Sequence, residues 1–181
     1  MQGFTNLAAD FGQAIAVLIP LICYLGAGFF LLASGWGLWH LSKPGSFWER
    51  HPWVPFVTPL FAGILLSFDK FLNFGAATMG GGAQSSMDSS MTSYLPPTVD
   101  PSTLLGATPE DTLLNIISMF IYFFRSYGAL VVLLGVFSLK SVVEGNRKGA
   151  TSLSIIMIGF GFGFCIMNVD SIATAVVQKF N

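Results

Sequence analysis

Four long apolar runs, separated by polar stretches, constrain this chain more than any other feature. They cover residues 13–39, 53–74, 116–139 and 151–176. A helix needs about 20 predominantly apolar residues to cross the hydrocarbon core of a bilayer, so each run is long enough for one span. Only 9% of the residues are charged, whereas about a quarter are charged in a typical soluble domain. The sequence therefore predicts an all-α membrane protein with four transmembrane helices.

The runs divide the chain into three parts. We expect residues 1–75 to form a first helical hairpin with an N-terminal segment, and residues 112–181 to form a second hairpin in tandem with it. Residues 76–111 are rich in Gly, Ser, Met and Pro and predict a long loop. Within this loop, residues 108–111 (Thr-Pro-Glu-Asp) have the composition of a helix start, with a cap, a proline in the first position and acids in the first turn.

Basic residues are unevenly distributed among the connections. Residues 41–52 and 140–150 contain Lys and Arg, whereas loop 76–111 contains Asp and Glu without any Lys or Arg. Cytoplasmic loops carry an excess of Lys and Arg, so the two basic connections are predicted to be cytoplasmic. Both termini and loop 76–111 then face the periplasm of a bacterial inner membrane, and only Lys179 opposes this orientation.

Arg125 lies inside the third apolar run, where an ionisable side chain is costly and usually has a specific partner. Asp69 and Asp170, each near the outer end of another run, are the candidate partners. If the third span begins near Ser118, Arg125 lies about 10 Å below the outer boundary. We expect these three residues to form an intramembrane charge cluster. In the alternative interpretation, the Arg125 side chain extends to the lipid headgroups.

Small residues recur at positions that permit close helix approach in a membrane. The predicted packing positions are Gly28, Gly35, Gly128, Gly135, Gly159 and Gly163. The first two match the next two at an offset of one hundred residues, and the two candidate acids match at one residue more. This pattern indicates two copies of one hairpin in the same orientation. These glycines could pack helices within one bundle or helices of different subunits, and the sequence does not distinguish the two.

Prolines predict a local break in the second run. Pro59 has no N–H, so the carbonyl oxygen of Pro55 lacks its helical donor. We therefore expect a kink between Pro55 and Pro59.

The sequence contains no motif for catalysis or cofactor binding. His40 and His51 flank a basic turn, no Ser-His-Asp set or paired His ligands occur, and Gly80–Gly82 lacks the lysine of a phosphate loop. Met79, Met87 and Met91 have no His or Cys near them in sequence, which favours an adaptable apolar contact surface over a soft-metal site. We expect no enzymatic activity, no cofactor, no metal site and no direct nucleic-acid binding.

Two passages resemble a known group of small membrane proteins. One runs from Tyr24 through Gly35-Trp-Gly-Leu-Trp-His-Leu-Ser-Lys43 to Pro52-Trp-Val-Pro-Phe-Val-Thr-Pro-Leu60, and the other from Tyr127 through Lys140 to Glu144-Gly-Asn-Arg-Lys-Gly149. Both are similar to the hairpin of the inner-membrane proteins of type IVB secretion, namely the IcmC/DotE, IcmD/DotP and DotV group of Dot/Icm systems and their TraQ and TraR relatives in conjugative plasmids. The resemblance covers both hairpins and leaves out the Met-rich loop.

The resemblance implies a structural component of a DNA- or protein-transfer machine, without catalytic residues to carry over. The implied partners are the lipid bilayer, other secretion or conjugation membrane proteins, and further subunits of a homo- or hetero-oligomer. Two other functions stay open. One is a small transporter or channel whose polar pathway uses Arg125, Asp69 and Asp170, and the other is a pilin-like subunit that polymerises through small-residue helix faces.

Labelling of engineered cysteines tests the predicted orientation. In intact cells, a cysteine at Ser46 should be shielded from a membrane-impermeant thiol reagent, because its connection is basic, and a cysteine at Ser89 should be labelled. The parent chain, with Cys23 and Cys165, gives the background. Labelling at Ser46 without labelling at Ser89 reverses the orientation, and equal labelling contradicts the predicted hairpins.

Overall fold

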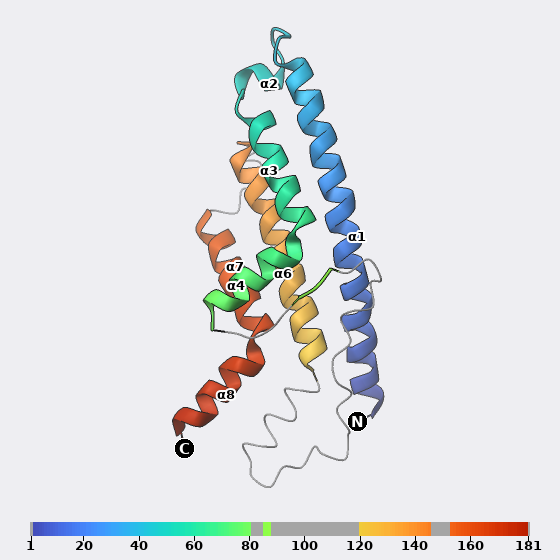
Figure 1. Cartoon of the computed structure of the whole chain (residues 1–181), viewed down its shortest axis with the longest axis vertical. Coiled ribbons are helices and arrows are strands. Elements are labelled where there is room, and N and C mark those ends of the chain that lie inside the picture. Colours follow the sequence, from blue (N-terminus) through green and yellow to red (C-terminus); the bar gives the residue numbers. More distant parts are fainter. Residues whose placement is uncertain (1, 81–84, 88–119, 146–152, 181) are drawn as a thin grey trace.

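A computed structural model of the chain describes residues 2–80, 85–87, 120–145 and 153–180. In this part of the chain every regular element is a helix (Figure 1). The helices are α1 (Gln2–His40), α2 (Phe47–Arg50), α3 (Val54–Leu66), α4 (Phe68–Thr78), α6 (Ile121–Val143), α7 (Leu153–Met167) and α8 (Val169–Phe180). The predicted all-α class is confirmed. The expected helix start at residues 108–111 lies outside the described residues.

Two helices are each long and apolar enough to cross a membrane, over Asp10–His40 in α1 and Phe123–Val143 in α6. The other two predicted runs are each divided. α3 and α4 meet at Ser67 with a bend of 77°, and α7 and α8 meet at Asn168 with a bend of 73°. The described chain thus has two candidate spans, or up to four if each bent pair is one span. The predicted spans over 53–74 and 151–176 are thus each two helices joined at a sharp bend, and the four-span arrangement stays a prediction.

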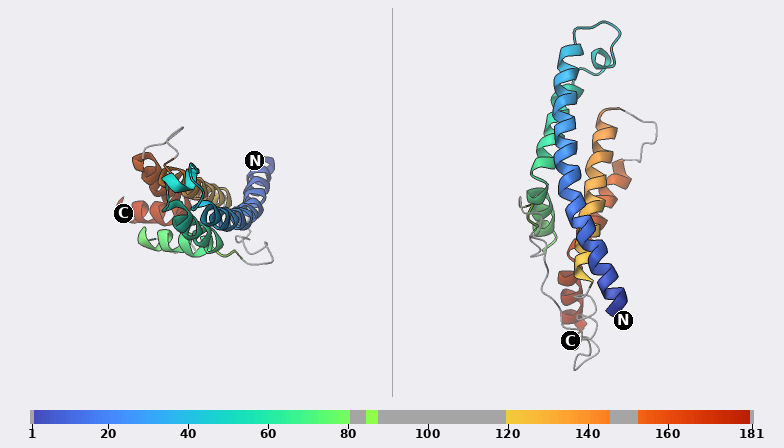
Figure 2. Two further views of the ribbon diagram at one scale, coloured as in Figure 1. Left: turned by 90° about the horizontal axis from the view of Figure 1, so that it is seen from above. Right: turned by 90° about the vertical axis from the view of Figure 1, so that its right-hand side faces the viewer.

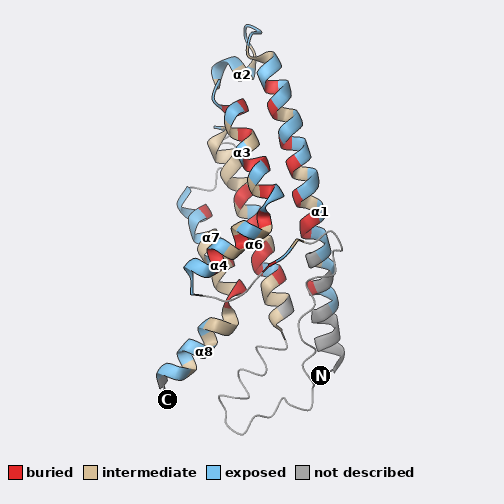
Figure 3. Ribbon diagram, viewed as in Figure 1, coloured by how far each residue is buried: buried red, intermediate tan, exposed pale blue. Residues whose placement is uncertain are grey.

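The long helices form a bundle in which α1 and α6 lie side by side (Figures 1 and 2). α3 packs along α1, and α7 packs along α6. Buried apolar side chains from these helices meet in one core, where Figure 3 shows the buried positions on the facing sides. Cys23 and Ala27 of α1 are fully buried, and small side chains there let α1 lie close to its neighbours. This arrangement fixes which face of each helix points away from the bundle.

The break in the second run is not at its prolines. α3 stays helical through Pro59, and the sharp bend of the second run lies at Ser67, so the helix is not broken where the kink between Pro55 and Pro59 is predicted. The carbonyl oxygen of Pro55, which lacks its helical donor, accepts a hydrogen bond from Ser34 Oγ of α1 at 2.7 Å. Because the neighbouring helix supplies the missing donor, this buried oxygen is satisfied without a break in α3.

The backbones of α6 and α7 come into contact at two glycines. A Cβ atom added to Gly128 would lie 2.6 Å from the carbonyl oxygen of Gly163 and 2.7 Å from Cγ of Met167. A Cβ atom added to Gly163 would lie 2.7 Å from Cγ2 of Val132. Both glycines are therefore required for the approach of the two helices within one chain.

Alanine substitution tests this contact. Gly128→Ala should lower the free energy of unfolding by about 1–3 kcal/mol, because the added methyl group overlaps the backbone of α7. A Cβ atom at Gly159 meets nothing within 4 Å, so Gly159→Ala should leave stability unchanged or raise it by about 0.5–1 kcal/mol through helix propensity. Unfolding of the purified protein in SDS, followed by circular dichroism, measures both. Equal effects of the two substitutions would contradict the contact.

Candidate functional site

Arg125 of α6 and Asp170 of α8 form an ion pair. Arg125 Nη2 lies 3.0 Å from Asp170 Oδ2, although 45 residues separate them in sequence. The break at Asn168 ends α7 and begins α8, whose first turn contains Asp170 and contacts α6. A carboxylate in the first turn of a helix is also favoured by the helix dipole. The break therefore places the acid where α6 can supply its cation.

The pair is only partly shielded from the surroundings of the bundle. The side chains of Arg125 and Asp170 are 28% and 40% exposed. Exposed pairs contribute about 0.2–1 kcal/mol, whereas removing one partner of a buried pair costs about 3–5 kcal/mol. Because both side chains are partly exposed, we expect the contribution of the Arg125–Asp170 pair to stability to lie between these two values.

Asp69, the third member of the predicted charge cluster, is not joined to this pair. It lies in the first turn of α4, directly after the break at Ser67, and so occupies the position in the first half that Asp170 occupies in the second. Among the described residues no ion pair links it to Arg125 or to another cation. The position one hundred residues before Arg125 is Leu25, so α1 supplies no cation there. The described structure brings together two of the three predicted residues.

Two polar residues beside the ion pair were missed in the sequence. Ser126 follows Arg125 and is 1% exposed, and Asn168 lies at the break and is 0% exposed. Asn168 Nδ2 donates to the carbonyl oxygen of Phe164 at 2.9 Å. The signal was present, since each is a polar residue inside an apolar run and next to an ionisable one. Arg125, Asp170, Ser126 and Asn168 are called the polar site below.

The six predicted packing glycines divide into two groups. Gly128, Gly135 and Gly163 pack inside the chain, and the space for a Cβ atom at Gly135 is limited by Phe160 at 2.9 Å. At Gly28, Gly35 and Gly159, no atom of the described residues lies within 4 Å of an added Cβ atom. The glycines matched between the two halves therefore lie in different surroundings.

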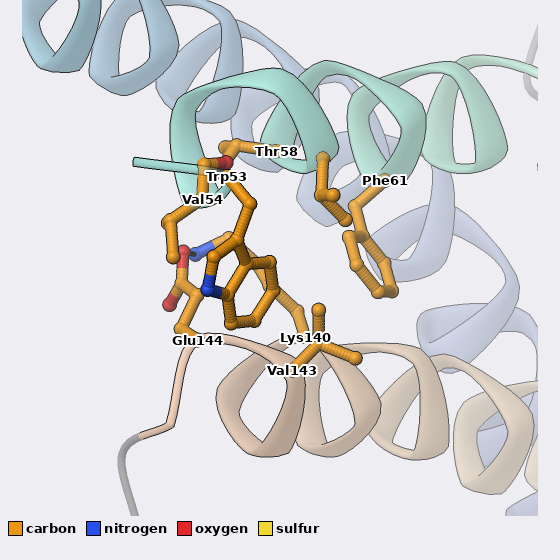
Figure 4. Close-up of a pocket in the computed structure, with 8 residues that line it drawn as sticks. Trp53, Val54, Thr58, Phe61, Lys140, Val143 and Glu144 are labelled. Carbon is orange, nitrogen blue, oxygen red and sulfur yellow. Dashed lines mark hydrogen bonds and ion pairs between the residues drawn. The ribbon is translucent and has the colours of Figure 1, made fainter. Parts of the chain in front are cut away.

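A second charged pair lines a small cleft between α3 and α6 (Figure 4). Lys140 Nζ lies 2.5 Å from Glu144 Oε1 and 4.3 Å from the ring centroid of Phe30. Trp53, directly before α3, and Phe61 of α3 form the apolar wall opposite. The empty space of about 130 Å³ is partly open to the surroundings, and the cleft encloses no room for a ligand. The cleft is therefore a packing contact between α3 and α6, beside the Lys140–Glu144 pair.

The methionine near the end of α4 has a sulfur neighbour that the sequence did not reveal. Met79 Sδ lies 3.9 Å from Cys165 Sγ of α7. Met87 packs against the core. Two residues earlier, the Ser85 N–H donates to Asn73 Oδ1 at 2.6 Å, and the Ser85 carbonyl oxygen accepts from Asn73 Nδ2 at 2.8 Å. Within the described ranges no three His, Cys, Asp or Glu side chains gather. Met91 lies outside the described residues.

Comparison of the chain with protein families, curated proteins and solved structures gives no match. The chemistry of the polar site must therefore be read from its own groups. The Arg125 guanidinium provides positive charge and hydrogen-bond donors. Together with Asp170 it can connect α6 to α8 and can bind small hydrogen-bonding molecules.

A double-mutant cycle tests the ion pair. Arg125→Leu, Asp170→Leu and the double variant should give a coupling energy of about 1–2 kcal/mol, between the values of exposed and buried pairs. Asp69→Leu is the matched control, because Asp69 lies at the corresponding position after the first break and forms no ion pair with Arg125 in the described structure. Unfolding in SDS measures each free energy. Coupling of Arg125 to Asp69 but not to Asp170 would reverse the assignment.

Proposed function

We propose that the chain is an integral membrane component of a type IVB secretion or conjugative DNA-transfer apparatus and acts by helix–helix assembly. In this proposal it crosses the bacterial inner membrane four times, as two tandem hairpins built from α1 with α3–α4 and from α6 with α7–α8. Connections 41–52 and 140–150 are cytoplasmic, and both termini and loop 76–111 are periplasmic. The motif resemblance supports the apparatus, and the distribution of basic residues supports the orientation.

The outer face of α1 gives the main support for the proposed assembly mechanism. Gly28 and Gly35 are exposed and have open space around them. Large apolar side chains surround them on the same helix, including Leu25, Phe29, Leu32 and Trp36, which are 65–75% exposed. Helices in lipid associate largely by close packing at small residues, so a helix of another subunit can approach α1 at these glycines. Gly163 is unsuited to this role, because α6 already covers it.

The transporter alternative has weaker support. It requires Arg125, Asp69 and Asp170 along one polar pathway, and the described structure joins only Arg125 and Asp170. Ion flux through the purified protein in liposomes would favour that alternative. A helical polymer of the purified protein would favour the pilin-like form of assembly.

Leucine substitution on α1 tests the assembly mechanism. Gly28→Leu should weaken association of the chain with itself or with co-expressed apparatus proteins at least tenfold, because the larger side chain holds the helices apart. Its thermal unfolding should match that of the parent, since no atom in the described part of the chain lies within 4 Å of the new Cβ atom. Cross-linking and native mass spectrometry measure the assembly.

Gly159→Leu is the matched control, because Gly159 is also open but lies on α7. It should assemble as the parent does. Normal assembly and transfer by Gly28→Leu would overturn the proposed role of α1, and a monomer that conducts ions would favour the transporter.

A further inference from the structure

Four buried polar atoms in the polar site have no hydrogen-bond partner in the described part of the chain. They are Arg125 Nε, Ser126 Oγ, Asn168 Oδ1 and Asp170 Oδ1. Ser126 and Asn168 are more than nine-tenths buried. Buried polar atoms are nearly always paired, and unpaired ones are especially costly inside a membrane. Four such atoms on two packed segments indicate a bound molecule.

Two contacts bracket these atoms. On one side the Arg125–Asp170 ion pair joins α6 to α8 at 3.0 Å. On the other side Gly128 lies so close to Met167 that an added Cβ atom would be 2.7 Å from its Cγ. Ser126 and Asn168 lie between these contacts along α6 and along the α7–α8 segment. The unpaired atoms therefore belong to one place in the fold, at the break between α7 and α8.

We propose that this place is a binding site for ordered water. Arg125 Nε only donates hydrogen bonds, Asn168 Oδ1 and the ionised carboxylate of Asp170 only accept them, and the Ser126 hydroxyl does both. A cation would be repelled by Arg125, and an anion would be repelled by Asp170. Water both donates and accepts, and a buried water typically makes about three hydrogen bonds to otherwise unpaired groups.

Water can reach the site past the ion pair. The side chains of Arg125 and Asp170 are 28% and 40% exposed, whereas Ser126 behind them is buried. Bound water completes the hydrogen bonding of both charged groups within the helical bundle. The site is thus a hydrated opening at the helix break, and this inference does not depend on the proposed assembly function.

Reactivity of a buried thiol toward hydrogen peroxide tests the hydration. Peroxide is small and polar. A thiolate sulfur attacks one of its oxygens, the O–O bond breaks, and the products are a sulfenic acid and a hydroxide ion, which takes up a proton to become water. Ser126→Cys in nanodiscs should lose its thiol at least tenfold faster than Ala129→Cys, which is also buried on α6 but lies in the apolar core. Peptide mass spectrometry after quenching and alkylation distinguishes the new thiol from Cys23 and Cys165. Equal rates would overturn the proposal.

A second measurement avoids the engineered thiol. Removing a hydroxyl that binds water loses a hydrogen bond, whereas removing an unpaired hydroxyl from a dry site is favourable. Ser126→Ala should therefore lower Tm relative to Ser138→Ala, a half-buried position on the same helix that controls for helix propensity. A higher Tm for Ser126→Ala than for Ser138→Ala would show a dry site and would overturn the proposal.

Discussion

A buried backbone carbonyl that loses its helical donor needs another donor in the protein, and one such oxygen links two helices of this chain. Pro59 removes the donor of the Pro55 oxygen, and Ser34 of α1 replaces it at 2.7 Å. α3 therefore continues and is linked to α1 at the same point. At the end of α7, the Phe164 oxygen accepts from the backbone N–H of Asn168 at 3.2 Å and from its side-chain Nδ2 at 2.9 Å, so this oxygen stays paired where the chain turns.

The close approach of α6 and α7 positions the polar site. Gly128 and Gly163 bring the two backbones together about one helical turn from Arg125. The break at Asn168 then directs the start of α8 back against α6, where Asp170 meets Arg125. A side chain at Gly128 would separate the helices and lengthen the distance between the two charges. Packing and electrostatics are thus coupled through one short part of α6.

The two halves have the same order of helices but differ in the contacts that their side chains make. Each has a long helix and a bent helix pair, with an acid two residues after the break, at Asp69 and Asp170. The second half supplies an arginine and buries Gly128 against α7. The first half has no matching arginine and leaves Gly28 exposed. The second half thus holds the polar site, while the first offers the open surface that the assembly proposal uses.

The sequence alone determined the helical class and the apolar runs, because lipid accepts few backbone structures other than helices and because run length and charge are local properties. It also singled out Arg125, since a charge in an apolar run is costly wherever its neighbours lie. Only the tertiary structure decided that the partner is Asp170 and not Asp69, and that Gly163 faces inward while Gly28 faces outward. Those outcomes depend on how each helix is rotated about its axis and on which helix lies beside it. The spacing of side chains along a single helix specifies neither the rotation nor the neighbour.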